Sequence, residues 1–151
     1  MSASKTRVLI LEDNDALRVM LFTILRHQPL GVDTAQSPEE ALERVRTCDY
    51  ALIIIDMDLA AGGSHIFLDT FHEERPESTT FILAVRDPAR ETLIEPELVN
   101  AVMNKPIEID TLADVVRECA LVVPPPPDPL PCPPAESEGM PRFDADGSWP
   151  N

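Results

Sequence analysis

The chain has 151 residues, which fits one domain with an additional segment, and 44% of them are hydrophobic, as in most globular proteins. Its formal net charge of −15 disfavours binding to nucleic acid or to an anionic membrane surface. No apolar run is long enough for a membrane span, and the N-terminus lacks the apolar region of a signal peptide. The cysteines Cys48, Cys119 and Cys132 are widely spaced, so we expect reduced thiols in a cytoplasmic protein.

Short apolar runs alternate with amphipathic stretches along the first 122 residues. Strands are predicted at 7–11, 31–35, 50–55, 80–85 and 99–103. Helices are predicted at 16–27, 38–47, 65–74 and 110–122, and a shortened helix interrupted by Pro96 is expected between residues 89 and 100. Ser37 and Pro38 are typical of a helix start. This alternation predicts an α/β fold with a parallel sheet and helices on both faces.

Acidic side chains directly follow two of these predicted strands. Asp56 and Asp58 end the apolar run that begins at Tyr50, and Glu12 and Asp13 end the first strand. An acid at the carboxyl end of a buried strand lies at the edge where open α/β sheets bind ligands. The alternative interpretation is that these acids only start loops or cap the next helices.

Lys105 follows the fifth strand, so it is expected at the same edge of the sheet. Three carboxylates beside one ammonium group can hold a hard cation such as Mg²⁺. With that cation, Asp56 could attack a phosphoryl donor, and Lys105 could pair with a phosphoryl oxygen. Each element alone is weak evidence, but the four together in this order are specific.

These motifs resemble those of the response-regulator receiver domain of bacterial-type two-component signalling. The matching segments are VLILEDND at 8–15, AQSPEEAL at 35–42, LIIIDMDL at 52–59 and NKPIEIDTL at 104–112. The resemblance covers residues 5–122. It implies a flavodoxin-like (βα)5 fold with the strand order 2-1-3-4-5.

The resemblance also implies roles for individual residues. Glu12, Asp13 and Asp56 would bind Mg²⁺, together with the backbone carbonyl of Asp58. Asp56 would accept a phosphoryl group from a histidine kinase or a histidine phosphotransfer protein, and Lys105 would contact that group. A downstream protein partner would receive the signal.

Three positions depart from the family pattern. The hydroxyl residue at the end of the fourth strand corresponds to Ala84 or Val85, and neither has a hydroxyl group. The aromatic residue three positions before the lysine is Val102, and the usual proline four residues after the acceptor is Ala60. These departures leave the metal and acceptor chemistry intact, but they put the usual coupling between phosphorylation and the fourth helix, fifth strand and fifth helix in doubt.

The composition changes sharply at the C-terminus. Residues 124–151 hold 10 of the 16 prolines and a charge of −4 from five acids and one arginine. We therefore expect 123–151 to be a disordered, Pro-rich acidic tail, either a spacer or a segment that docks in an aromatic-lined groove. We expect no DNA-binding or enzymatic output domain after Val123.

The sequence therefore predicts a single-domain, non-enzymatic response regulator in a phosphorelay. The alternative is a pseudo-receiver, an interaction module that no phosphoryl group controls. A flavodoxin-like cofactor enzyme is disfavoured because no Gly-rich loop follows the first strand. A phosphatase that uses Asp56 and Asp58 is the least favoured alternative.

Overall fold

The structure is a computed structural model that describes residues 6–124, 126 and 129–139. Its five strands are β1 (Arg7–Leu11), β2 (Gly31–Ala35), β3 (Leu52–Asp56), β4 (Phe81–Arg86) and β5 (Ala101–Asn104). Its α-helices in this range are α1 (Asp15–Leu25), α2 (Pro38–Thr47), α3 (Gly63–Glu74) and α4 (Ile109–Val122). Short 3-10 turns occur at η1 (Ala60–Gly62) and η2 (Glu136–Gly139). In the described residues no helix combines the length and apolar character needed to cross a bilayer.

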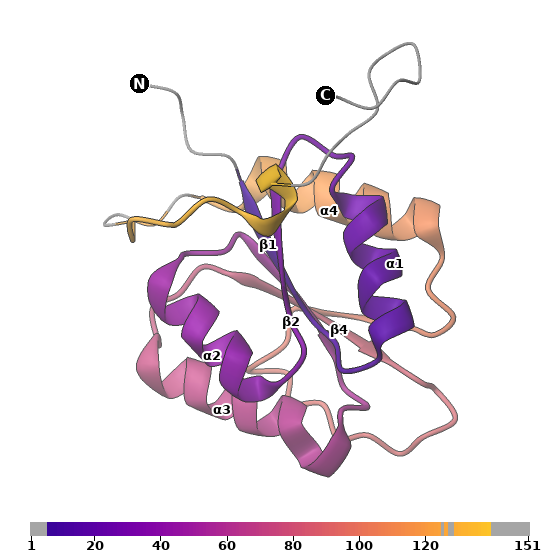
Figure 1. The fold of residues 1–151 in the computed structure, drawn as a ribbon. Coiled ribbons are helices and arrows are strands. Elements are labelled where there is room, and N and C mark those ends of the chain that lie inside the picture. Colours follow the sequence, from indigo (N-terminus) through magenta and orange to yellow (C-terminus); the bar gives the residue numbers. More distant parts are fainter. Residues whose placement is uncertain (1–5, 125, 127–128, 140–151) are drawn as a thin grey trace.

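The strands form one parallel sheet in the order β2-β1-β3-β4-β5, which confirms the predicted topology. Figure 1 shows α1 and α4 on one face of this sheet and α2 and α3 on the other. Alternate residues of β1 and β3 point to opposite faces, so Ile53 and Ile55 enter one core and Ile54 enters the other. Burial on both faces explains why these strands read as continuous apolar runs.

The N-terminus of α2 forms as predicted from local sequence signals. Ser37 is the N-cap residue, and its hydroxyl accepts a 3.2 Å hydrogen bond from the backbone N–H of Glu40. Pro38 occupies the first helical turn, where its missing N–H costs no hydrogen bond.

The helix expected between β4 and β5 is absent, so this part of the prediction is wrong. Residues 87–100 form two turns, closed by hydrogen bonds from Arg90 N to Asp87 O and from Leu98 N to Glu95 O, both of 3.0 Å. Pro96 lacks an N–H, and its ring clashes with the carbonyl four residues earlier in a helix. The sheet is therefore flanked by four α-helices in the described residues, and the 87–100 loop covers the α2–α3 core only partly.

The C-terminal segment is ordered where the structure describes it, contrary to the expectation of a disordered tail. Residues 129–139, called the strap below, run from Asp49 past Arg7 of β1, and η2 lies beside the edge strand β2 (Figure 1). Ala135 and Ser137 are buried there, with exposed fractions of 3% and 1%. The rest of the predicted tail, at 140–151, lies outside the described residues.

A disulfide joins Cys48, at the end of α2, to Cys132 in the strap. The expectation that these two cysteines are reduced is therefore wrong, and with it the argument that placed the chain in the cytoplasm. Spacing gave no signal for the pair because 84 residues separate the two cysteines. Cys119 keeps a free thiol, as expected, and it is buried.

Candidate functional site

Three carboxylates meet at the carboxyl edge of the sheet. Glu12 and Asp13 follow β1, Asp56 ends β3, and one carboxylate oxygen of each lies within 4.8 Å of the others. Glu12 and Asp56 are buried, with exposed fractions of 1% and 6%, whereas Asp13 is exposed. Because β1 and β3 are adjacent in the sheet, residues 44 positions apart in the chain converge here, as the sequence predicted.

Backbone N–H groups hold each of these carboxylates in place. Asn14 N donates to Oε2 of Glu12 at 3.3 Å, and Asp58 N donates to Oδ1 of Asp56 at 2.8 Å. Ala60 N donates to Oδ2 of Asp13 at 3.3 Å, which links the loop after β3 to the acidic cluster. Asn14, rather than one of the acids, caps α1 by accepting a 2.9 Å bond from Leu17 N.

Lys105 lies between two of the acids. Its Nζ is 3.0 Å from Oδ2 of Asp56 and 3.1 Å from Oδ2 of Asp58. The lysine follows β5, two strands away from β3, so this contact depends on the predicted strand order. The Lys105–Pro106 peptide bond is cis.

The charges in this cluster shift the pKa values in opposite directions. Burial, followed by the hydrogen bond to Asp56 and its negative charge, raises the pKa of Glu12 to about 8. Burial also raises the pKa of Asp56, but hydrogen bonds from Glu12, Asp58 N and Lys105 outweigh it and hold that pKa below its usual value. Asp56 is therefore ionised at neutral pH, and Glu12 holds the proton of the hydrogen bond between the two carboxyl groups.

The side chain of Asp58 has a role that sequence reasoning missed. Its Oδ2 accepts a 2.8 Å hydrogen bond from the backbone N–H of Asp87, besides its ion pair with Lys105. Asp58 thus connects Lys105, which follows β5, and the start of the 87–100 loop to the end of β3. No sequence signal marks this contact, because its donor is a backbone N–H that any residue except proline would supply at position 87.

Val85 is the β4 residue that lies beside Asp56, on the same face of the sheet. The register of the β3–β4 pair aligns Asp56 with Val85 and Ile55 with Ala84. Aligned residues of neighbouring parallel strands point to the same face, so Val85 shares the face of Asp56 and Ala84 faces the α2–α3 core. The ambiguity between Ala84 and Val85 is resolved in favour of Val85. Arg86 does not contact the acids; its Nε donates to Asn104 at 3.2 Å.

The fold and this acidic edge define a receiver-type signalling module. The sequence matches the family model for the response regulator receiver domain over residues 8–117, so the chain belongs to that family. No curated protein matches the sequence. Solved structures with the same fold are a CheY-like receiver domain protein from Methanospirillum hungatei JF-1, a CheY-like receiver domain from Methylobacillus flagellatus and a sensor protein from Polaromonas sp. JS666.

Sequence identity to these three structures is low although the folds agree. Identities are 21%, 24% and 23%, and TM-scores are 0.67, 0.67 and 0.68, respectively. The alignments cover 78%, 77% and 79% of this chain and 94%, 99% and 98% of the others. The shared part is therefore nearly the whole of each relative, and these structures support the fold of the domain alone.

Mg²⁺, which the family implies, suits the residues at this edge. Mg²⁺ takes oxygen ligands at short distances and retains several waters, so it needs only a few protein carboxylates on an accessible edge. Glu12, Asp13 and Asp56 offer three such oxygens, and exposed Asp13 leaves the cluster open to solvent. Lys105 supplies the one ammonium group beside these carboxylates in the described residues, so a bound cation would offset negative charge that remains.

Proposed function

We propose that this protein is a single-domain response regulator that accepts a phosphoryl group on Asp56. The observation that carries the proposal is the position of Lys105, with Nζ 3.0 Å from Oδ2 of Asp56 beside the Glu12–Asp13–Asp56 cluster. A buried acid that only started a loop would need only one hydrogen-bonding or charged partner to offset its burial. An ionised carboxylate between a cation-binding cluster and an ammonium group instead has the requirements for phosphoryl transfer.

Glu12, Asp13 and Asp56 are the side chains that would hold Mg²⁺, and the backbone carbonyl of Asp58 is a further proposed ligand. When bound, the cation would offset the negative charge that accumulates where a phosphoryl donor meets three carboxylates. The chain itself positions these ligands through the N–H groups of Asn14, Asp58 and Ala60.

The reaction that we propose is an in-line displacement at phosphorus. An Oδ atom of Asp56 forms the new P–O bond as the P–N bond of a phosphohistidine donor breaks, and the released imidazole nitrogen takes a proton from water. Lys105 exchanges its contact with Asp56 for a phosphoryl oxygen. Asp58 keeps the lysine at the site, because it holds a second ion pair with Nζ at 3.1 Å.

The donor would be a histidine kinase or a histidine phosphotransfer protein, and the product would act through contacts with a downstream protein. We place the reaction in the cytoplasm because phosphohistidine donors are made from ATP. The pseudo-receiver alternative gains support from Val85, which has no hydroxyl for the phosphoryl group, and from Val102 at the family's aromatic position.

The proposal is tested by incubating the full chain with Mg²⁺ and acetyl phosphate and measuring its intact mass. We expect one phosphoryl adduct, which is lost in Asp56→Asn and kept in Asp69→Asn, a matched change at an exposed aspartate on α3. Beryllium fluoride with Mg²⁺ should shift the amide resonances around Asp56 in the wild type only. Absence of both responses in folded wild-type protein would leave the pseudo-receiver as the function.

A further inference from the structure

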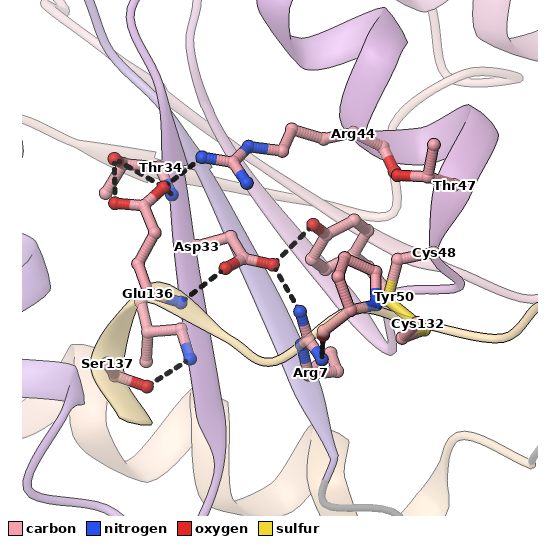
Figure 2. A network of polar contacts seen from close by, with 12 residues as sticks. Arg7, Asp33, Thr34, Arg44, Thr47, Cys48, Tyr50, Cys132, Glu136 and Ser137 are labelled. Atoms are coloured by element: carbon pink, nitrogen blue, oxygen red, sulfur yellow. Dashed lines mark hydrogen bonds and ion pairs between the residues drawn. A yellow bond between two sulfur atoms is a disulfide. The ribbon is translucent and has the colours of Figure 1, made fainter. Parts of the chain in front are cut away.

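The strap fills hydrogen-bonding positions that a neighbouring strand would fill at the edge of the sheet. Ser137 Oγ accepts a 2.9 Å bond from Val32 N, and Glu136 Oε1 accepts a 2.9 Å bond from Thr34 N. These two N–H groups are two residues apart on β2, the spacing at which an edge strand presents its unpaired donors. Figure 2 shows both contacts, together with an ion pair between Arg44 and Glu136.

A second set of contacts joins the strap to a buried polar group beneath it. Oδ2 of Asp33 accepts hydrogen bonds from Arg7 at 2.8 Å and from Tyr50 at 2.6 Å, and its Oδ1 accepts one from Glu136 N at 2.9 Å. Arg7 also donates to the carbonyl of Pro133 at 2.6 Å. The strap therefore completes the hydrogen bonds of a carboxylate that is only 1% exposed (Figure 2).

The strap buries little apolar surface of its own. Among its described hydrophobic side chains only Ala135 is fully buried, and Pro131, Pro133 and Pro134 are exposed. Its attachment consists of hydrogen bonds, which gain little net free energy against water, and one covalent bond. The disulfide keeps the strap at a high local concentration beside β2, so its loss should weaken every other contact of the segment.

The two sulfur atoms of this disulfide differ in their surroundings. Cys132 belongs to the exposed part of the strap, whereas Cys48 is 1% exposed and packs in the α2–α3 core. A reductant therefore meets the Cys132 side of the bond. Sγ of Cys48 lies 3.6 Å from the carbonyl oxygen of Asp49, which can accept the thiol hydrogen once the bond is open.

We propose that Cys48–Cys132 is a thiol–disulfide exchange site whose substrate is a dithiol reductant, and that it sets whether the strap covers β2. In the oxidised protein the strap closes the sheet edge. In the reduced protein the strap leaves, and the N–H groups of Val32 and Thr34 become an open edge. This site is separate from the acidic edge, and the proposal does not depend on phosphorylation of Asp56.

The disulfide is reduced in two exchange steps. A thiolate of the dithiol attacks Sγ of Cys132, a new S–S bond forms between them, and Cys48 leaves as a thiolate that takes a proton. The second thiol of the reductant then loses its proton and attacks the reductant's first sulfur, which is bonded to Cys132 in the mixed disulfide. This step releases Cys132 as a thiolate, which is protonated in turn. The dithiol is oxidised to a disulfide, and the protein disulfide is reduced to two thiols.

The test compares amide hydrogen exchange in the full chain before and after treatment with dithiothreitol, with intact mass reporting the state of the bond. We expect reduction to accelerate exchange at Val32 and Thr34 by about tenfold or more and to leave Ile53 and Ile54, in the central strand β3, unchanged. Cys48→Ser/Cys132→Ser should show the fast exchange without reductant and no further change with it. Cys119→Ser, at the buried free thiol, should respond as the wild type does.

Three results would overturn the proposal. The first is unchanged protection of Val32 and Thr34 in protein whose mass shows that the bond is reduced. The second is an equal acceleration by dithiothreitol in the double-serine variant, which would place the effect elsewhere. The third is a chain that stays in the dithiol form when treated with oxidised glutathione. The wild-type measurement needs no substitution, so it remains decisive if the double variant does not fold.

Discussion

Asp56 and Val85 are direct neighbours in the parallel β3–β4 pair, on the same face of the sheet. A phosphoryl group on Asp56 would therefore meet a valine side chain where the family has a hydroxyl. A ligand shifts a conformational equilibrium only through contacts that differ between the two states. Val102, at the family's aromatic position, is 44% exposed and too small to fill space opened by such a movement.

We predict that modification of Asp56 is weakly coupled to β5 and α4, by about 1 kcal/mol or less, at the low end of typical allosteric coupling. The local response should be in residues 57–64, because Ala60 N is bonded to Asp13 in the acidic cluster. Amide shifts with and without beryllium fluoride measure both regions. Shifts in residues 101–122 as large as those in 57–64 would contradict the prediction.

A matched pair of substitutions tests the cause of the weak coupling. Val85→Thr places a hydroxyl on the face of Asp56 and should increase the beryllium fluoride response of β5 and α4. Ala84→Thr places the same group on the opposite face, in the α2–α3 core, and should not increase it. Equal responses of the two variants would show that the register does not control the coupling.

The sheet and the acidic edge were predictable because their signals are local or combine through strand order. The runs of β1, β3 and β5 end at or beside a residue of the site, and parallel strands deliver those ends to one edge, so Glu12, Asp56 and Lys105 could be placed together. The contact between Asp58 and Asp87 N was not predictable, because it needs a loop geometry that replaces the expected helix.

The strap was missed for a different reason. Its composition predicts disorder because the segment has few apolar side chains to bury. Its order comes instead from single polar groups that match donors on β2 and from one disulfide, none of which has a sequence period. The signal was present in Cys132, but a widely spaced cysteine gives no partner by itself.

Removing the charge of Asp13 should abolish the response to Mg²⁺. A cation that binds only the folded chain stabilises it by mass action, by about 2.7 kcal/mol at a hundredfold excess over Kd. We expect millimolar Mg²⁺ to raise the melting temperature of the wild type but not that of Asp13→Asn. Asp15→Asn, at the exposed start of α1 two residues away, is the control and should respond normally. A wild type that does not respond would mean that the acids hold no cation.

The ion pair between Arg7 and Asp33 should make stability depend on acid pH. Burial raises the pKa of Asp33, but hydrogen bonds from Arg7, Tyr50 and Glu136 N outweigh it and lower that pKa below its ordinary value of 3.8. A lowered pKa gives stability that is fully present above the unfolded value and is lost as the pH falls through the folded value. Urea unfolding from neutral to acid pH should show this loss.

Asp33→Asn isolates that contribution. The variant should be less stable than the wild type at neutral pH by about 1–3 kcal/mol, since Arg7 loses its charged acceptor. The difference in the free energy of unfolding should narrow as the pH falls below 3.8, the ordinary value for the carboxyl group, and through the lower pKa of Asp33 in the folded wild type. A difference that stays constant from neutral to acid pH would mean that the charge of Asp33 contributes nothing. Asp69→Asn serves as the exposed control.

Truncation after Val123 should destabilise the domain, the opposite of what a disordered tail would do. The truncated chain loses the disulfide and exposes β2 and the carboxylate of Asp33. Loss of a disulfide that closes a long loop typically costs about 2–5 kcal/mol, and a cost in that range lowers the melting temperature by at least about 5 °C in a domain of this size. Truncation after Gly139 keeps all of the strap contacts described above and isolates the contribution of 124–139. If the two truncated chains melt at the same temperature under oxidising conditions, the strap adds no stability to the sheet.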